Sequence, residues 1–133
     1  NCTDNNLVFK INDKELLLLS IPESSFLNEE TPDGSPRIIN VGTTNQIIYR
    51  LYSGNVSSAT ICSTLPPASP VVEKEWNASG GTIEIITDAL YDVDGITING
   101  YTHNIKFKNV NFSNPDNSFS FTEYIFGNYE TDL

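Results

Sequence analysis

Few residues in this chain could carry acid–base or nucleophilic chemistry. His103 is the only histidine, so a triad-type catalyst would have to be built around it. Strand alternation places His103 on the same face as Tyr101, Ile105 and Phe107, which predicts a structural histidine within or beside the core. None of the serines lies in a Gly-x-Ser-x-Gly or Ser-x-x-Lys motif. The residues therefore predict no catalytic site.

Glu73 and Glu75 stand two residues apart and share one face of a predicted strand. Glycoside hydrolases place two carboxylates on opposite sides of a cleft, at separations of about 5 Å or more. We therefore interpret the pair as part of a solvent-exposed strand face.

Asp92-x-Asp94-Gly95 has the form of the start of a calcium-binding loop. An isoleucine and a histidine stand where an EF-hand loop requires further ligands. We interpret the segment as a hairpin turn. Asp88, Asp92 and Asp94 remain as calcium candidates, and no other metal or cofactor is expected.

Aromatic side chains suggest a second kind of site, because rings exposed in one plane can stack on sugars. Trp76, Tyr91 and Tyr52 are the candidates for such a ligand-binding platform. The alternative is that these rings pack in the core or are scattered over the surface.

The two cysteines, Cys2 and Cys62, lack the Cys-x-x-Cys spacing of a metal or redox site, and one histidine cannot complete a zinc ligand set. We predict a disulfide between them, worth roughly 4 kcal/mol by the loop-entropy model. Such a bond implies an oxidising compartment. The alternatives are two buried free thiols, or a lipid-anchor role for Cys2, although Asn1 precedes it and an anchor cysteine would be the first residue of the mature chain.

Composition restricts the partners that this chain can bind. Seventeen acidic residues against seven basic ones give a net charge of −10, without a basic cluster. This balance excludes nucleic acid, whose phosphates need Lys and Arg, and it excludes charge-driven binding to an anionic membrane. No apolar run approaches the about 20 residues of a transmembrane helix.

The predicted architecture centres on a long β-hairpin between Gly81 and Phe112. Its arms are residues 82–87 and 101–107, and an acidic turn around 92–95 lies between them. The apolar positions of the second arm change parity twice. We therefore expect β-bulges near Gly100 and near Asn109.

Shorter strands with polar turns account for the rest of the chain. Four consecutive leucines at 16–19 predict a strand covered on both faces. Three prolines between 22 and 36 predict a loop with one helical turn near 24–27. Other strands are predicted at 7–11, 37–41, 46–53, 71–77 and 118–125, with a further short segment at 57–62 after the turn at Gly54-Asn55.

In the last strand we expect Phe119, Phe121 and Ile125 to point inward, and the acidic end of the chain to fray. Residues 1–133 are thus predicted to form a single all-β domain, an antiparallel, Ig-like β-sandwich of about eight or nine strands.

Three stretches carry a resemblance: Tyr49-Arg50-Leu51-Tyr52, residues 61–70 and residues 95–112. They are similar to a group of uncharacterised cell-envelope lipoproteins of Bacteroidota, especially flavobacteria. The similarity is closest in Cys-Ser-x-x-Pro-Pro-x-Ser-Pro at 62–70 and in residues 98–110. It implies an exported, lipid-anchored β-domain in which Cys2 matches a second, early cysteine. The anchoring cysteine and its acidic tether would lie upstream of Asn1. The resemblance implies a location and no mechanism.

We therefore expect a non-enzymatic domain at the cell surface or on the periplasmic face of the outer membrane, acting as an accessory or interaction subunit of an outer-membrane protein. Its only membrane contact would be the upstream lipid anchor. The alternative is a carbohydrate- or calcium-binding β-sandwich module. A small hydrolase, the third hypothesis, would need a cleft that brings Glu73 or Glu75 to a second acid. The sequence indicates no oligomeric state.

Overall fold

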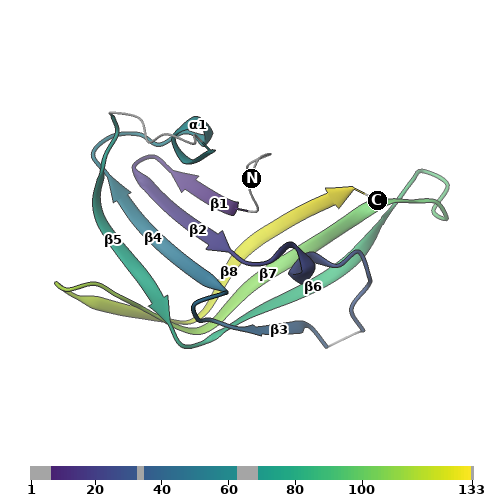
Figure 1. The fold of residues 1–133 in the computed structure, drawn as a ribbon. Helices are drawn as coiled ribbons and strands as arrows, with labels where there is room; N and C mark the ends of the chain where they lie inside the picture. The colour runs from purple at the N-terminus through teal and green to yellow at the C-terminus, as the bar shows by residue number, and fades with distance from the viewer. Residues whose placement is uncertain (1–6, 33–34, 63–68, 133) are drawn as a thin grey trace.

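The computed structural model describes residues 7–32, 35–62 and 69–132 and places its eight β-strands in one antiparallel sheet (Figure 1). The sheet order is β1-β2-β4-β5-β7-β6-β3, and β8 pairs with β7 along the edge opposite β6. The all-β prediction is confirmed, and the number of strands falls in the predicted range. The elements are β1 (Leu7–Asn12), β2 (Glu15–Ser20), a 3₁₀ turn (Glu23–Phe26), β3 (Arg37–Asn40), β4 (Gln46–Tyr52), α1 (Ser58–Cys62), β5 (Val72–Ser79), β6 (Thr82–Tyr91), β7 (Ile98–Ser113) and β8 (Ser118–Asp132).

β5 and β6 follow one another directly, separated only by Gly80 and Gly81, and together they link the two halves of the sheet. β5 pairs with the end of β7 and β6 with the rest of it, in the same register from Asn77 across the two glycines as far as Leu90. Between them Gly80 and Gly81 have φ angles of 69° and 85°, and a Cβ on Gly81 would lie 2.5 Å from the carbonyl oxygen of Asn109. Only glycine fits this corner, where β5 leaves β7 and turns to pair with β4.

The bend brings the two halves of the sheet around a common core. β1, β2, β4 and β5 form one half, and β3, β6, β7 and β8 form the other (Figure 1). The sandwich-like packing therefore comes from one bent sheet, whereas an immunoglobulin domain packs two separate sheets. The buried residues of this core are Val8, Leu19, Ile21, Phe26, Ile47, Trp76, Ile83, Ile85, Ile105, Phe107, Val110, Phe112 and Phe126.

A second, smaller cluster covers the other face of β2 and β4. Leu16 and Leu18 belong to this cluster, while Leu17 and Leu19 face the common core. The prediction that the leucine strand is covered on both faces is thus confirmed. Part of the cover is Ile61 of α1. The segment at 57–62 is therefore largely a short helix that packs on the sheet, although its sequence has no helical periodicity. Within the described segments, no helix is long and apolar enough to cross a membrane.

The predicted central hairpin is confirmed as β6 and β7, and so is the bulge near Gly100, whereas the bulge predicted near Asn109 is wrong because the pairing of β7 shows no register shift there. The register of β6 against β7 shifts between Leu90 and Tyr91, opposite Gly100. Asn109 has a φ of 54°, and the apolar side chains on either side of it are both buried. This left-handed residue lies opposite the glycine corner, so both strands bend together and the register is kept.

The last strand differs from its prediction. Ile125 is 60% exposed whereas Phe126 is buried, because the register against β7 shifts in this region and Gly127 takes a φ of 133°. Phe121 lies beside the core but keeps 38% of its surface exposed. The predicted fraying is also wrong, since β8 stays paired with β7 as far as Asp132.

Candidate functional site: an aromatic groove between two sheet edges

A groove of about 740 Å³ opens between β1 and β8. β1, β3 and β8 each have only one partner among the described strands, and of these edges β1 and β8 supply residues to the groove. The Lys10 ammonium donates to the Tyr124 hydroxyl at 3.2 Å, which joins the two edges. The groove is lined by Lys10, Ile11, Asn12, Glu15, Leu17, Tyr49, Phe112, Phe119, Phe121 and Tyr124.

Four rings from β7 and β8 form one wall of the groove. Phe112 stacks on Phe119, with centroids 5.1 Å apart and ring planes 17° apart. Phe121 stacks on Tyr124 at 5.4 Å and 24°, and it meets both rings of the first pair edge-on. Phe112 is fully buried and Phe121 is 38% exposed, so the aromatic wall runs from the core out to solvent.

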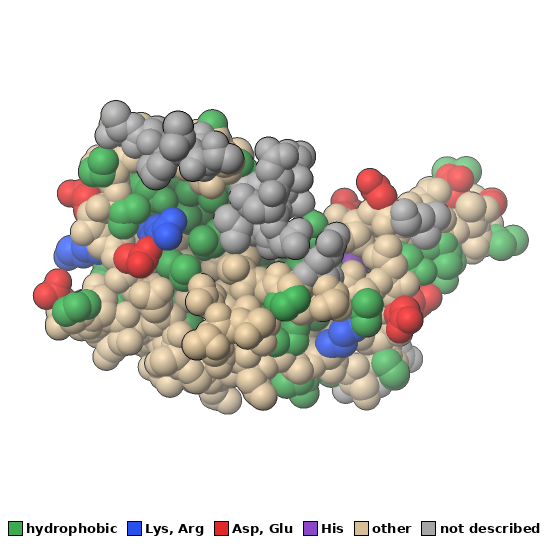
Figure 2. Space-filling view, viewed as in Figure 1, with side chains coloured by type: hydrophobic (Ala, Val, Ile, Leu, Met, Phe, Trp, Pro, Cys, Tyr) green, Lys and Arg blue, Asp and Glu red, His purple; other side chains and the backbone are tan. Residues whose placement is uncertain are grey.

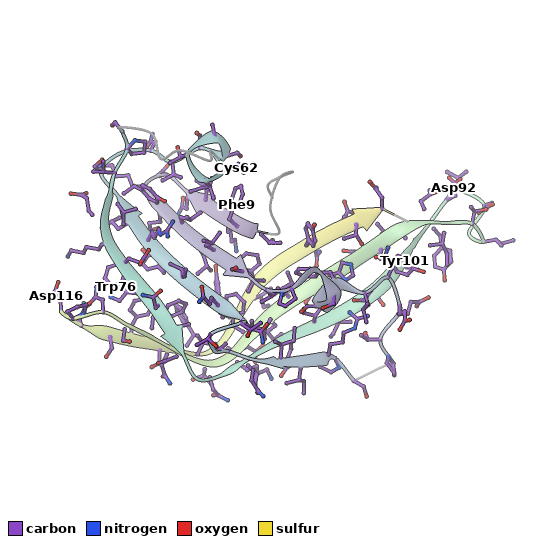
Figure 3. The ribbon with its side chains drawn as sticks, in the orientation of Figure 1. Phe9, Cys62, Trp76, Asp92, Tyr101 and Asp116 are labelled. Atoms are coloured by element: carbon purple, nitrogen blue, oxygen red, sulfur yellow. The ribbon has the colours of Figure 1, made fainter. Side chains whose placement is uncertain are left out.

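The floor of the groove rests on the only tryptophan of the chain. The Tyr49 ring lies 5.3 Å from that of Trp76, and both rings contact Phe119. Trp76 Nε1 donates to Asn117 Oδ1 at 2.8 Å, which fixes the indole beside the β7–β8 turn (Figure 3). A ligand in the groove would therefore lie one ring away from Trp76.

Polar groups from the β1–β2 hairpin and from β4 lie along the rim. The Tyr49 hydroxyl donates to Glu15 Oε1. Burial, and then this bond to a carboxylate, raise the pKa of Tyr49 to about 12. The Lys10 ammonium lies 5.2 Å from the centroid of the Tyr124 ring. Together with the Asn12 amide, the rim offers one cation, one anion and several hydrogen-bonding groups.

The titratable side chains that line the groove are few. The lining holds one carboxylate, Glu15, and no histidine or cysteine. The acids at Glu73 and Glu75 are elsewhere: Glu75 pairs with Arg50 at 2.6 Å, and Glu73 is exposed on β5. An apolar ring can stack on the aromatic wall while its polar substituents reach the rim.

His103 lies outside the groove lining, in the half formed by β6, β7 and β8. Its side chain is fully buried, with Nδ1 2.8 Å from Thr87 Oγ1 and Nε2 2.9 Å from Thr131 Oγ1. Arg37 donates to the same Thr87 hydroxyl at 2.7 Å. Burial, and then the charge of Arg37, lower the pKa of His103. Both ring nitrogens are thus engaged in holding strands together.

The three predicted platform aromatics do not come together. Trp76 is buried behind the groove floor, and Tyr52 is buried in the second cluster on the other face of the sheet. Tyr91 is 52% exposed at the far end of β6. The alternative interpretation, rings packed in the core or scattered over the surface, therefore describes these three residues, because the strands that carry them lie on different faces and ends of the bent sheet.

The calcium candidates are also not brought together as a site. Both carboxylate oxygens of Asp94 accept bonds within the turn, from the Ile96 and Thr97 amides and the Thr97 hydroxyl. These bonds, that of the Thr97 hydroxyl first, lower the pKa of Asp94 to about 2. Asp92 accepts from the amide of the residue that follows it. No group of three or more acids, histidines or cysteines suited to a metal occurs in the described parts of the chain, and Asp88 therefore has no such set to join.

Of the two cysteines in the predicted Cys2–Cys62 disulfide, the structure describes only Cys62. Cys62 is the last residue of α1, is partly buried and is not a free thiol. Cys2 lies outside the described residues, so the pairing stays a prediction.

Sequence reasoning missed the groove residues, although one signal was present. Five of the seven phenylalanines fall between positions 107 and 126, and three of them, Phe112, Phe119 and Phe121, line the groove. Lys10 and Glu15 gave no such signal, because only the bent sheet places them opposite the last strand.

Comparison of the chain with protein-family models, with curated proteins and with solved structures found no match.

Proposed function

We propose that this chain is a non-enzymatic interaction domain of the bacterial cell envelope, with the aromatic groove as its binding site. The observation that carries the proposal is the groove itself, whose aromatic wall reaches solvent at Phe121 and whose rim carries Lys10 and Glu15. Export to the cell surface or to the periplasmic face of the outer membrane is supported by the sequence resemblance and by the predicted disulfide.

The first candidate ligand is a segment of an outer-membrane or cell-surface protein. Phe and Tyr are enriched at the centre of protein–protein interfaces, and Tyr is one of the residues that contribute most to binding energy there. An apolar anchor of the partner would insert between Phe121 and Tyr49, and its polar neighbours would meet Lys10 and Glu15 at the rim. In this role the domain is an accessory subunit of a larger protein.

The second candidate is a carbohydrate, favoured by one specific observation. Phe121 and Tyr124 present two rings only 24° from parallel, and Lys10, Asn12 and Glu15 lie along the same groove. Rings beside such mixed donors and acceptors suit a sugar, which has an apolar face and a hydroxylated edge.

Two variants of β8 make a matched test. Phe121→Ser removes an exposed ring of the groove, and Ile125→Ser changes an exposed residue of the same strand that does not line it. The full-length lipid-tethered protein would be recovered from native membranes in each form. A stoichiometric partner should be retained by the wild type and Ile125→Ser and lost by at least about 10-fold with Phe121→Ser.

The same three proteins on a glycan array separate the two candidates. Binding of a sugar on the array by the wild type and Ile125→Ser, and its loss with Phe121→Ser, would favour the carbohydrate. Titration of that sugar followed by Trp76 fluorescence would then measure its affinity. Equal behaviour of Phe121→Ser and the wild type in both assays, with unchanged thermal stability, would refute the groove as the binding site.

A further inference from the structure

We infer that the tip of the β6–β7 hairpin, residues 92–97, is a second docking point, separate from the groove, for a protein whose surface has an apolar pocket bordered by Lys and Arg. The tip extends past the end of β8 (Figure 1). Hydrophobic and acidic side chains occur together at this end of the molecule (Figure 2).

The two aliphatic side chains of the tip serve no purpose within the fold. Val93 is 104% exposed and Ile96 is 81% exposed, so neither packs against the domain. The turn needs Asp94 for its hydrogen bonds and Gly95 for a φ of 72°, but it needs no aliphatic residue at 93 or 96. Adjacent exposed apolar residues at the end of a protruding hairpin are typical of a binding surface.

The tip is held in one conformation before it meets a partner. The Asp92 amide donates to the Thr97 carbonyl at 2.7 Å, and the Gly95 amide donates to the Asp92 carbonyl at 2.9 Å. Asp94 accepts three further bonds inside the same six residues. Docking would therefore order little additional backbone, which favours affinity.

Charge identifies the kind of partner. The tip carries two acids, Asp92 and Asp94, and no Lys or Arg, and a further acid, Asp132, lies opposite Gly100 at the same end of the sheet. Asp94 is ionised at neutral pH, as an exposed carboxyl is, and the hydrogen bonds within the turn lower its pKa further, to about 2. Acids around an apolar centre complement a pocket with a basic rim. They oppose insertion into an anionic lipid surface and association with a second copy of a chain whose net charge is −10.

Photo-crosslinking in the native cells tests the inference. The full-length protein would carry benzoylphenylalanine in place of Val93, and in place of Ile125 as the control. We expect one dominant cross-linked protein from position 93 and not from position 125. With that protein purified, Val93→Ser with Ile96→Ser should weaken binding at least about 10-fold, and Ile125→Ser by less than about 2-fold. Higher salt should weaken the wild-type complex.

Other outcomes would overturn the inference. These are equal cross-linking from both positions, unchanged affinity of the double variant, binding of the purified protein to phosphatidylcholine–phosphatidylglycerol vesicles through the tip, or self-association that the double variant abolishes. Phe121→Ser should leave the cross-link from position 93 intact. Failure of the groove proposal and failure of the tip proposal therefore give different results.

Discussion

Gly81→Ala should destabilise the domain far more than Gly80→Ala, although both glycines form the same corner with positive φ. Each alanine carries a left-handed backbone cost of about 1–2 kcal/mol. Each also restricts the unfolded chain, which offsets about 0.4–1 kcal/mol. Because both terms apply equally to the two variants, they contribute little to the difference in the free energy of unfolding between Gly81→Ala and Gly80→Ala.

The difference comes from what the added methyl group meets. At Gly81 it would lie 2.5 Å from the Asn109 carbonyl oxygen and 2.7 Å from that of Lys108, whereas at Gly80 the nearest atom is Asn111 Nδ2 at 3.8 Å. Backbone carbonyls of a paired strand cannot rotate away, so β7 itself must shift. Overpacking of this kind costs about 1–3 kcal/mol. We expect a loss of about 1 kcal/mol for Gly80→Ala and about 3 kcal/mol for Gly81→Ala.

Urea denaturation followed by Trp76 fluorescence measures both variants in one assay. With a slope of about 1–2 kcal/mol per M, a difference of about 2 kcal/mol separates the two midpoints by about 1–2 M. Midpoints within about 0.3 M of each other would refute the assignment of the corner to a close backbone approach. An equal loss in both variants would mean that φ alone decides the cost.

Three further predictions concern single side chains. Burial lowers the pKa of His103 in the folded protein, so on acidification the unfolded chain protonates this histidine at a higher pH than the folded chain does. The free energy of unfolding should therefore fall as the pH drops below about 6.5. Urea midpoints between pH 7.5 and 5 should show a shallower fall for His103→Gln, and equal slopes would contradict the assignment. Tyr49 should remain protonated at about pH 11, where exposed tyrosines have ionised, and spectrophotometric titration of Tyr49→Phe should lack its late step. Asp94→Ala should speed amide exchange at Ile96 and Thr97. In the wild type this protection should be lost only as the pH falls to about 2, because the hydrogen bonds of the turn lower the pKa of Asp94 to that value; unchanged exchange rates in Asp94→Ala would count against the turn.

Alternation along the chain was enough to predict most of the strands. The central hairpin, its bulge near Gly100, and the two-sided leucine strand follow from which positions are apolar. These features depend on local parity, which a sequence displays directly.

The bend of the sheet could not be predicted in the same way. Gly81 was predicted to begin the central hairpin, whereas in the structure the pairing with β7 continues in the same register from β5 across Gly80 and Gly81 into β6. Local periodicity does not show which strands pair, so this continuation could not be predicted. The groove was missed for the same reason, because its walls come from opposite ends of the chain. The five-residue helix α1 was missed because its cover of Leu16 and Leu18 is a tertiary contact.

β5 and β6, separated only by Gly80 and Gly81, also determine how the molecule unfolds. β5 is paired with β4 and with the end of β7, β6 is paired with β3 and with the rest of β7, and both strands contribute to one core. Neither half can melt without exposing apolar surface of the other, so heating should give a single calorimetric transition with equal van't Hoff and calorimetric enthalpies. For the same reason a chain cut between Gly80 and Gly81 would leave two pieces that each lack half of their packing, and neither should fold alone.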